Sequence, residues 1–305
     1  MRRMQHGSAI IAALLVVALV ATVGTRMMWE QHFWVRQVAN DRDRAQAHQL
    51  AQTSIDWARA VLAYDRRAGV VDHEGESWAA RLPVFTTDGS TVEGHIEDEQ
   101  GKFNLNNLAP GGQVNNAALA LFMRLLTQLG LPPDLAYPLA DWQDSDAQVL
   151  HAGSAEAVYY LAQEPPYRTA DGPLGDVAEL LLVRGYDAGV IARLRPFVTV
   201  LPEGTSINVN TAPAEVLAAA VEGLGIFEAR RLVQVRKNMP FGTPEEFKGQ
   251  LPKSLASSDV GNIAVGSRYF TVRGSVIQGN VRLALVALLD RSDVGFPKTI
   301  WLRLN

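Results

Sequence analysis

The sequence predicts an α+β protein in which a long N-terminal helix packs on an antiparallel sheet and a large α-helical domain is inserted between the strands. No proline or glycine interrupts the chain from Met27 to Asp65, so one helix can continue through this stretch. Segments that alternate between apolar and polar residues occur in both halves of the chain, as strands of one sheet do. Residues 106–205 show helical spacing instead and form the predicted insert.

The chain begins with a basic leader that is followed by an apolar run. Residues 7–25 carry no charge, Arg2 and Arg3 precede them, and Arg26 follows. About 20 residues in one helix cover the hydrocarbon core of a bilayer, which is about 30 Å thick. The basic residues before the run predict an N-terminus in the cytoplasm and a body outside. We therefore expect a single-pass transmembrane helix over residues 8–26.

Three alternatives for this N-terminal segment remain open on the residues alone. A secretory signal peptide would be cleaved after the apolar stretch, and the small residues at 18–21 offer a site for this. A simple signal anchor would not be cleaved at all. Cleavage between Gly7 and Ser8 would instead remove the basic leader and leave the apolar helix on the mature chain.

The segment after the membrane continues the helix. Apolar and small residues recur there at spacings of three and four, which places them on one face. A helix from Ser8 to Tyr64 would be roughly 85 Å long. Sustained heptads are missing, which argues against a coiled-coil stalk. The residues on the predicted packing face are Ala47, Leu50, Ala51, Ser54, Ala58 and Val61.

The strands of the predicted sheet come from both ends of the body. Residues 92–97 alternate like a strand, and Gly279-Asn280 forms a hairpin turn between two β-rich runs, residues 269–278 and 281–289. Residues 299–304 form the last predicted strand. Predicted helices of the insert cover residues 117–129, 133–142, 155–162, 177–183 and 188–194.

The body contains an internal repeat. Residues 103–106 (Phe-Asn-Leu-Asn) match residues 207–210 (Ile-Asn-Val-Asn), and each copy is followed by a helix and a glycine-containing turn. Further on, residues 173–180 match residues 240–247. Because the spacing differs between the copies, we interpret them as one repeated helical module rather than an array.

The second copy resembles a helix-hairpin-helix module, whose glycines allow a DNA phosphate to approach the hairpin. Val221–Gly225 would be the hairpin, and the helix after it carries Arg230, Arg231, Arg236 and Lys237. This pattern supports an alternative function, a membrane-anchored protein for DNA binding or uptake. The net charge of −4 and the pI of 5.9 argue against a general nucleic-acid surface, which needs an excess of basic residues. Asn208 and Asn210 can equally close turns and cap a helix.

A cluster of carboxylates follows the second predicted helix of the insert. Asp141, Asp144, Asp146 and Glu156 offer oxygen ligands of the kind that calcium prefers. The cluster is not an EF-hand, because the glycine of the sharp turn is missing. A solvated loop with aspartate caps is the alternative. Residues 97–99 form a second acidic run, which we expect to be a surface loop, and residues 72–74 are expected to form a polar loop.

The sequence gives no support for an enzyme. It contains no cysteine, which excludes disulfides and thiolate chemistry. No histidine pair has zinc-binding helical spacing, and no Gly-x-Ser-x-Gly elbow or phosphate loop occurs. Two carboxylates could hydrolyse a glycoside, but no sequence rule selects the pair.

Residues 1–15 resemble a type IV prepilin leader. In that family a membrane aspartyl peptidase cuts after the glycine, here Gly7, and methylates the new N-terminus, here Ser8. A glutamate is usual at the fifth mature position, where this chain has Ala12. The large minor pseudopilins of type II secretion, the GspK family, lack that glutamate, and residues 141–146, 164–170, 179–187 and 208–212 also resemble this family.

The resemblance implies a pilin-like fold and a pseudopilin at the tip of the type II secretion pseudopilus, where it starts or caps assembly for protein export. It implies the prepilin peptidase, GspI-like and GspJ-like minor pseudopilins, the major pseudopilin and secreted substrates as partners, and no nucleic acid. It also implies an inner-membrane anchor, a periplasmic body, and calcium in the inserted domain. The predicted segments are a leader (1–7), a membrane helix (8–26), a pilin-like part (27–105), the insert (106–205) and a C-terminal part with the hairpin module and sheet (206–305).

Overall fold

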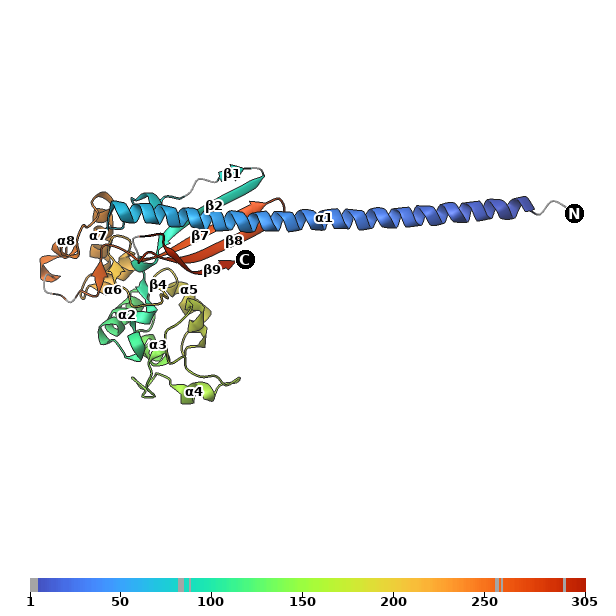
Figure 1. Cartoon of the computed structure of the whole chain (residues 1–305). Coiled ribbons are helices and arrows are strands. Elements are labelled where there is room, and N and C mark those ends of the chain that lie inside the picture. Colours follow the sequence, from blue (N-terminus) through green and yellow to red (C-terminus); the bar gives the residue numbers. More distant parts are fainter. Residues whose placement is uncertain (1–4, 82–84, 88, 256–257, 259, 293–294) are drawn as a thin grey trace.

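A single helix dominates the computed structural model, which describes residues 5–81, 85–87, 89–255, 258, 260–292 and 295–305, with side chains from residue 9. Helix α1 runs from Gln5 to Ala68 (Figure 1). Its first half projects away from the rest of the molecule, and its second half lies along the sheet. This confirms the predicted continuous helix and extends it by a few residues at each end. Residues 1–4 of the predicted leader, with Arg2 and Arg3, lie outside the described residues.

The sheet that faces α1 has five antiparallel strands in the order β1-β2-β7-β8-β9. The hairpin β7–β8 turns at Gly279, whose φ of +54° suits a residue without a Cβ. The four predicted strands are confirmed as β2, β7, β8 and β9, whereas the short edge strand β1 was not foreseen. The strands are β1 (Phe85–Thr87), β2 (Ser90–Asp98), β7 (Tyr269–Gln278), β8 (Val281–Asp290) and β9 (Lys298–Leu304).

One hydrophobic core fixes α1 to this sheet. The helix contributes Ala47, Ala51, Ile55, Ala58 and Leu62, all buried, at spacings of three and four. Three of these five are alanines, and small side chains let the helix axis approach the sheet closely. The sheet side of the core consists of Ile96, Phe270, Val272, Val276, Leu283, Leu285, Ala287 and Leu289.

The helical part lies beside the sheet, near the end of α1 that is far from the N-terminus (Figure 1). The prediction is confirmed for α2 and α5. Residues 133–142 divide into the 3₁₀ turn η5 and helix α3, and residues 155–162 contain only the short helix α4. Residues 177–182 form the 3₁₀ helix η6 instead of an α-helix. The helices are α2 (Asn116–Gln128), η5 (Pro133–Leu135), α3 (Ala136–Gln143), α4 (Ala157–Leu161), η6 (Val177–Leu182), α5 (Ala188–Leu194), α6 (Ala214–Ala220), α7 (Ile226–Asn238) and α8 (Pro244–Gly249).

The structure confirms the internal repeat through two equivalent pairs of asparagines. Asn104 Oδ1 accepts a hydrogen bond from the Asn106 amide at 3.1 Å, as Asn208 Oδ1 does from the Asn210 amide at 3.0 Å. The second asparagine of each pair then binds the distant matched segment. Asn106 accepts from the Leu174 N–H at 2.8 Å and donates to the Leu174 C=O at 3.0 Å. Asn210 accepts from the Phe241 N–H and donates to the Phe241 C=O, each at 2.9 Å.

Each copy also closes with a short parallel strand pair. In the first copy β3 (Phe103–Asn104) pairs with β4 (Val198–Thr199), and in the second β5 (Ile207–Asn208) pairs with β6 (Ile263–Ala264). One hydrophobic core contains buried residues of both copies, from Phe103 to Leu251. The predicted boundary at residue 205 therefore separates two copies of a module but does not separate two cores, and as a domain boundary it stays a prediction.

Candidate functional site

The exposed half of α1 is the first functional feature. Within the described part of the chain, α1 is the helix that is long and apolar enough to cross a membrane. Its apolar side chains from Ile10 to Val23 are all exposed, because no other part of the body reaches them. A helix that exposes so many apolar side chains needs an apolar environment from outside the chain. The predicted cleavage site lies at the start of this helix, since α1 already includes Gly7 and Ser8 in its first turn.

The second feature is the acidic cluster in the first copy of the repeat. Asp141 lies in α3, Asp144 directly follows α3, and Glu156 directly precedes α4. All three are buried, and one carboxylate oxygen from each lies within 4.8 Å of the others. The structure thus brings together three of the four predicted ligands. Asp146 is exposed, and its Oδ1 accepts a hydrogen bond from the Gln148 amide at 2.7 Å; as a ligand it stays a prediction.

Local contacts explain how a loop can hold these carboxylates. Ser145 donates to the Gly112 carbonyl through both its amide and its hydroxyl, each at 3.1 Å. The Asp171 amide donates to the Trp142 carbonyl at 3.2 Å and so closes the loop at its other end. Between these ends, the Arg184 guanidinium donates to the Ser154 carbonyl at 2.9 Å. In the second copy of the repeat, a direct connection from α7 to Pro240 stands in the place of this loop.

Within the described part of the chain, several carboxylate oxygens of the cluster have no partner. Both oxygens of Asp144 and Oε1 of Glu156 are buried without a hydrogen-bond partner, while Asp141 accepts from the Ser154 hydroxyl and the Leu150 amide. Burial, with added repulsion from neighbouring carboxylates, raises the pKa of Asp144 to about 6 and that of Glu156 to about 7. Burial also raises the pKa of Asp141. Unpaired buried carboxylates are costly, and a hard cation with oxygen ligands would compensate them.

Sequence reasoning missed other polar residues in α3 and in the segment that follows it. The hydroxyl of Thr169 and the amide of Gln143 are buried and unpaired. The charge of Asp171 contributes to the raised pKa of Asp144, and Asp171 adopts a positive φ of 47°. The Asp171-Gly172-Pro173 sequence is a recognisable turn signal, which could have pointed to this residue.

The hairpin module of the second copy is built for packing. Gly223, with φ +80°, forms the hairpin between α6 and α7. Arg236, one of the predicted basic residues, is buried, and its guanidinium donates to the carbonyls of Val209 and Ala212 at 2.7 and 2.5 Å. Arg231 donates to the Gln250 carbonyl at 2.8 Å. Two of the candidate phosphate ligands therefore bind the protein's own backbone, which weakens the DNA-binding alternative.

Replacing Arg236 with glutamine is expected to lower the free energy of unfolding by roughly 2–3 kcal/mol, because two charged hydrogen bonds to buried carbonyls are lost. Arg230→Gln is the matched control, since the Arg230 side chain is exposed and its contact to Glu215 spans 4.0 Å. We expect a change within about 0.5 kcal/mol for this control. Thermal melts of both variants measure the difference. Equal melting temperatures would show that the two hydrogen bonds of Arg236 do not stabilise the fold.

A buried ion-pair cluster, which the sequence did not reveal, connects α1 to the rest of the body. It consists of Arg291, Asp65 and Asp72. Arg291 donates to Asp65 Oδ2 at 2.7 Å and to the two oxygens of Asp72 at 2.5 and 2.6 Å. Asp65, Asp72 and Glu76 also meet the spacing of a metal site, but the Arg291 guanidinium already neutralises the first two. Residues 72–74 lie outside helices and strands, as the predicted polar loop requires, but Asp72 is buried.

Two residues of the second acidic run, Asp98 and Glu99, are buried where a surface loop was expected. Asp98, at the end of β2, accepts hydrogen bonds from Asn208 Nδ2 at 2.9 Å and from the hydroxyls of Thr211 and Ser267, each at 2.6 Å. Burial raises its pKa to about 6. Glu99 is buried beside it and pairs with Lys102 at 3.0 Å. The helical part covers this end of the strand, and strand alternation alone cannot reveal such a cover.

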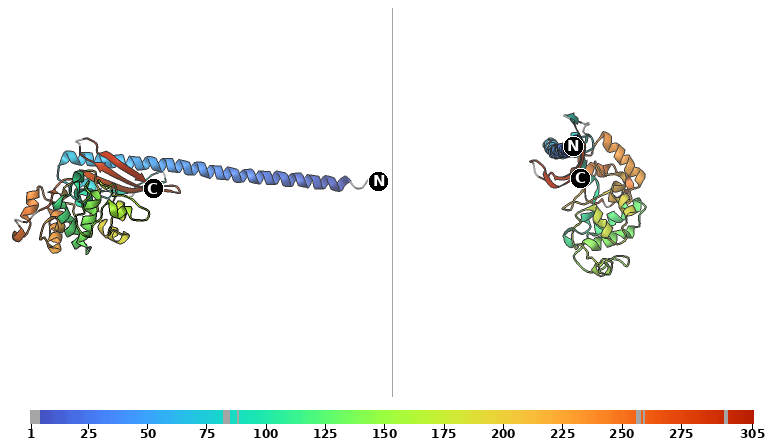
Figure 2. Two further views of the ribbon diagram at one scale, coloured as in Figure 1. Left: turned by 90° about the horizontal axis from the view of Figure 1, so that it is seen from below. Right: turned by 90° about the vertical axis from the view of Figure 1, so that its right-hand side faces the viewer.

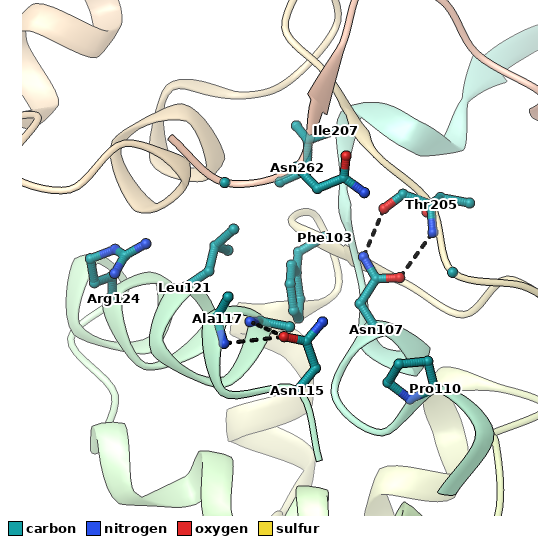
Figure 3. A pocket seen from close by; sticks show the side chains of 13 residues that line it. Phe103, Asn107, Pro110, Asn115, Ala117, Leu121, Arg124, Thr205, Ile207 and Asn262 are labelled. Atoms are coloured by element: carbon teal, nitrogen blue, oxygen red, sulfur yellow. Dashed lines mark hydrogen bonds between the residues drawn. The ribbon is translucent and has the colours of Figure 1, made fainter. Parts of the chain in front are cut away.

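A pocket lies where the two copies of the repeat meet, between Phe103 and Ile207 (Figure 3). Its polar groups are used within the protein. Asn107 donates to the Thr205 carbonyl at 2.8 Å and accepts from the Thr205 amide at 2.9 Å, and Arg124 donates to the Ala219 carbonyl at 2.7 Å. Among the described residues that line this pocket there is no nucleophile next to a general base, so it offers no catalytic arrangement.

These features define a class: a protein with a long, exposed apolar N-terminal helix that packs on an antiparallel sheet, and with a duplicated helical module in its body. Two family models described as "Type II secretion system (T2SS), protein K" match residues 101–203 and 207–266. Type II secretion system protein K of Pseudomonas aeruginosa is 38% identical, over 97% of this chain and 91% of that protein. The Klebsiella pneumoniae protein of the same name is 34% identical, over 97% and 95%. The chain belongs to the type II secretion system protein K family.

A solved structure shows the same fold. It is the GspK-GspI-GspJ complex from the type 2 secretion system of enterotoxigenic Escherichia coli. The match has a TM-score of 0.77 at 24% sequence identity and covers 88% of this chain and 99% of the matched one. The predicted pilin-like α+β fold is confirmed by this match. Within the family assignment, α1 fits a single-pass anchor in the inner membrane.

Proposed function

We propose that this chain is a minor pseudopilin at the tip of the type II secretion pseudopilus, where it starts or caps assembly and supports protein export. The observation that carries this proposal is the shape of the subunit. Seen along α1, the helical part lies to one side of the helix and not around it (Figure 2). It also lies beside the end of α1 that is distant from the N-terminus. A further subunit stacked above this one would collide with the helical part. This chain therefore fits the end of a filament.

The exposed half of α1 supports the choice of partners. Its apolar side chains are free to pack with the helices of GspI-like and GspJ-like minor pseudopilins and of the major pseudopilin, after the prepilin peptidase has cut at Gly7 and methylated Ser8. The body then stands in the periplasm, where it can meet secreted substrates. The pocket between the two copies of the repeat holds no catalytic arrangement among its described residues, and the hydrogen bonds of Arg231 and Arg236 within the fold disfavour nucleic-acid binding.

The acidic cluster supports a calcium site within this function. Asp141, Asp144 and Glu156 would hold the ion with carboxylate oxygens, and Asp146 is positioned by sequence to join them. Such an ion would compensate the unpaired carboxylates and fix the loop of residues 144–172, which is inserted into the first copy of the repeat. The role of the ion would be structural.

The full-length chain is expected to co-purify from membranes with the GspI-like and GspJ-like subunits of the same bacterium in a stoichiometric complex. Antibody labelling of pseudopili should then mark one end of each filament. A control in which Val17→Lys places a charge in the exposed apolar half should lower recovery of the complex, since a buried charge disfavours helix packing in lipid. Labelling along the whole filament would contradict the tip position, and a chain that purifies alone would contradict the proposed partners.

A further inference from the structure

A group of large side chains surrounds α1 just beyond its apolar run. Trp29, Phe33 and Trp34 are 78%, 68% and 63% exposed, and Met27 and Met28 beside them are also exposed. We name these five residues the aromatic collar. They lie before the part of α1 that packs on the described body, since the first buried residue of α1 is Ala47. At about 1.5 Å per residue, roughly 30 Å of helix separates Arg26 from Ala47.

The side chains of the collar point in several directions. Successive residues of an α-helix are about 100° apart, so Trp29 and Phe33 lie within about 40° of each other. Trp34 and Met28 each lie about 100° from that pair, on opposite sides of it. A single partner helix would be matched by one apolar stripe of about 100°. A collar that surrounds the helix fits an environment that is the same on all sides.

The position and the chemistry of the collar fit the outer headgroup layer of the membrane. The apolar run ends at Thr25, so Trp29 lies roughly 6 Å beyond it along the axis. Side chains of a helix lean toward its N-terminus, which brings the rings of Phe33 and Trp34 closer to the bilayer than their backbone. Tryptophan favours this layer because its ring is apolar and its N–H is polar. The exposed pair Arg26–Glu30, with Nε and Oε1 3.4 Å apart, lies at the same level.

We propose that the aromatic collar binds the periplasmic headgroup layer of the inner membrane and sets the depth of α1 before the subunit joins the filament. The body is thereby held about 20 Å or more above the layer in which the collar lies, because α1 alone connects the two. The proposal rests on the membrane anchoring proposed above. It adds a defined depth, which anchoring by the apolar run alone would not provide.

Tryptophan fluorescence in lipid nanodiscs tests the collar directly. The full-length chain is reconstituted in phosphatidylethanolamine and phosphatidylglycerol whose acyl chains are brominated close to the headgroup, since bromine quenches nearby indole rings. We expect brominated lipid to lower the emission of the wild-type chain. The Trp29→Phe/Trp34→Phe double variant should lose that response. The matched control is Trp57→Phe, because Trp57 is exposed on the same helix but lies beside strands β2 and β7 of the sheet; this variant should respond like the wild type.

Three results would overturn the proposal. The double variant could keep the full response to brominated lipid, which would place the responding rings elsewhere. The wild type could show no response although the nanodiscs retain it, which would leave the anchor intact and remove the collar from the membrane. Finally, the collar tryptophans could become shielded only when GspI-like and GspJ-like subunits are added, which would assign the collar to partner helices. Because all tested side chains are exposed, unchanged melting of the variants confirms that they are folded.

Discussion

Replacing Arg291 with methionine is expected to destabilise the body by about 3–5 kcal/mol, because it leaves Asp65 and Asp72 buried without their cationic partner. At roughly 2–4 °C per kcal/mol for a body of this size, the melting temperature should fall by on the order of 10 °C. The loss should affect the whole body, since Asp65 belongs to α1 while Arg291 follows the last residue of β8. A thermal melt of the full chain in detergent measures it.

Two comparisons sharpen this experiment. Arg303→Met removes an exposed ion pair with Asp176 and should cost less than about 1 kcal/mol. At lower pH, the difference in melting temperature between Arg291→Met and the wild type should become smaller. Burial raises the pKa of Asp65 to about 6, so below that pH Asp65 is protonated and no longer needs a cation. Equal melting temperatures of Arg291→Met and the wild type at pH 7.5 would show that the buried ion-pair cluster does not stabilise the fold.

Removing calcium with a chelator is expected to lower the melting temperature by about 5–10 °C. An ion at a concentration 100-fold above its Kd stabilises the folded state by about 2.7 kcal/mol, which corresponds to this shift. Asp144→Ala should abolish the response to calcium, because both oxygens of Asp144 are unpaired in the cluster. Without calcium, the same variant should melt above the wild type, since it removes a buried unpaired carboxylate.

The calcium response should also depend on pH in a defined direction. The raised pKa values of Asp144 (about 6) and Glu156 (about 7) mean that folding favours their protonated forms. Without the ion, their contribution to stability is greatest at low pH and falls as pH rises through this range. Calcium needs the ionised forms, so its stabilising effect should be small at pH 5.5 and larger at pH 8.

Matched variants test whether the calcium response depends on the acidic cluster or on any surface carboxylate. Asp134→Ala removes an exposed carboxylate of η5, outside the cluster, and should leave the calcium response unchanged. Asp146→Ala tests the fourth predicted ligand: loss of the response would include Asp146 in the site, and an unchanged response would exclude it. A melt of the wild type that does not change on adding chelator or calcium would eliminate the site.

Features that depend on residues close in sequence were predictable. The continuous α1 followed from the absence of proline and glycine and from the spacing of Ala47, Ala51 and Ala58. The hairpin β7–β8 followed from Gly279-Asn280 between two β-rich runs. The acidic cluster could be proposed because its members lie within one loop and its flanking helices. The repeat was visible because both asparagines of each pair occupy matched positions.

Features that depend on distant residues were not predictable. Arg291 meets Asp65 and Asp72 across 226 and 219 residues, and nothing in the local sequence of either segment indicates the contact. For the same reason the sequence did not reveal that Asp72 and Asp98 are buried. The burial of Arg236 was hidden because its carbonyl partners lie more than 20 residues earlier, at positions 24 and 27 residues away. A charged residue in a sequence is normally exposed, but it can be buried when the fold supplies an ion-pair or hydrogen-bond partner from a distant segment.

We expect the exposed N-terminal helix to stay on the mature subunit as its membrane anchor and assembly element. Mass spectrometry of the protein extracted from bacterial membranes tests this most directly. We predict a mature chain that begins with a methylated Ser8, which retains all of the apolar run. A mature chain that begins near Thr22, released into the periplasm, would contradict the anchor, the aromatic collar and the pseudopilin assignment together.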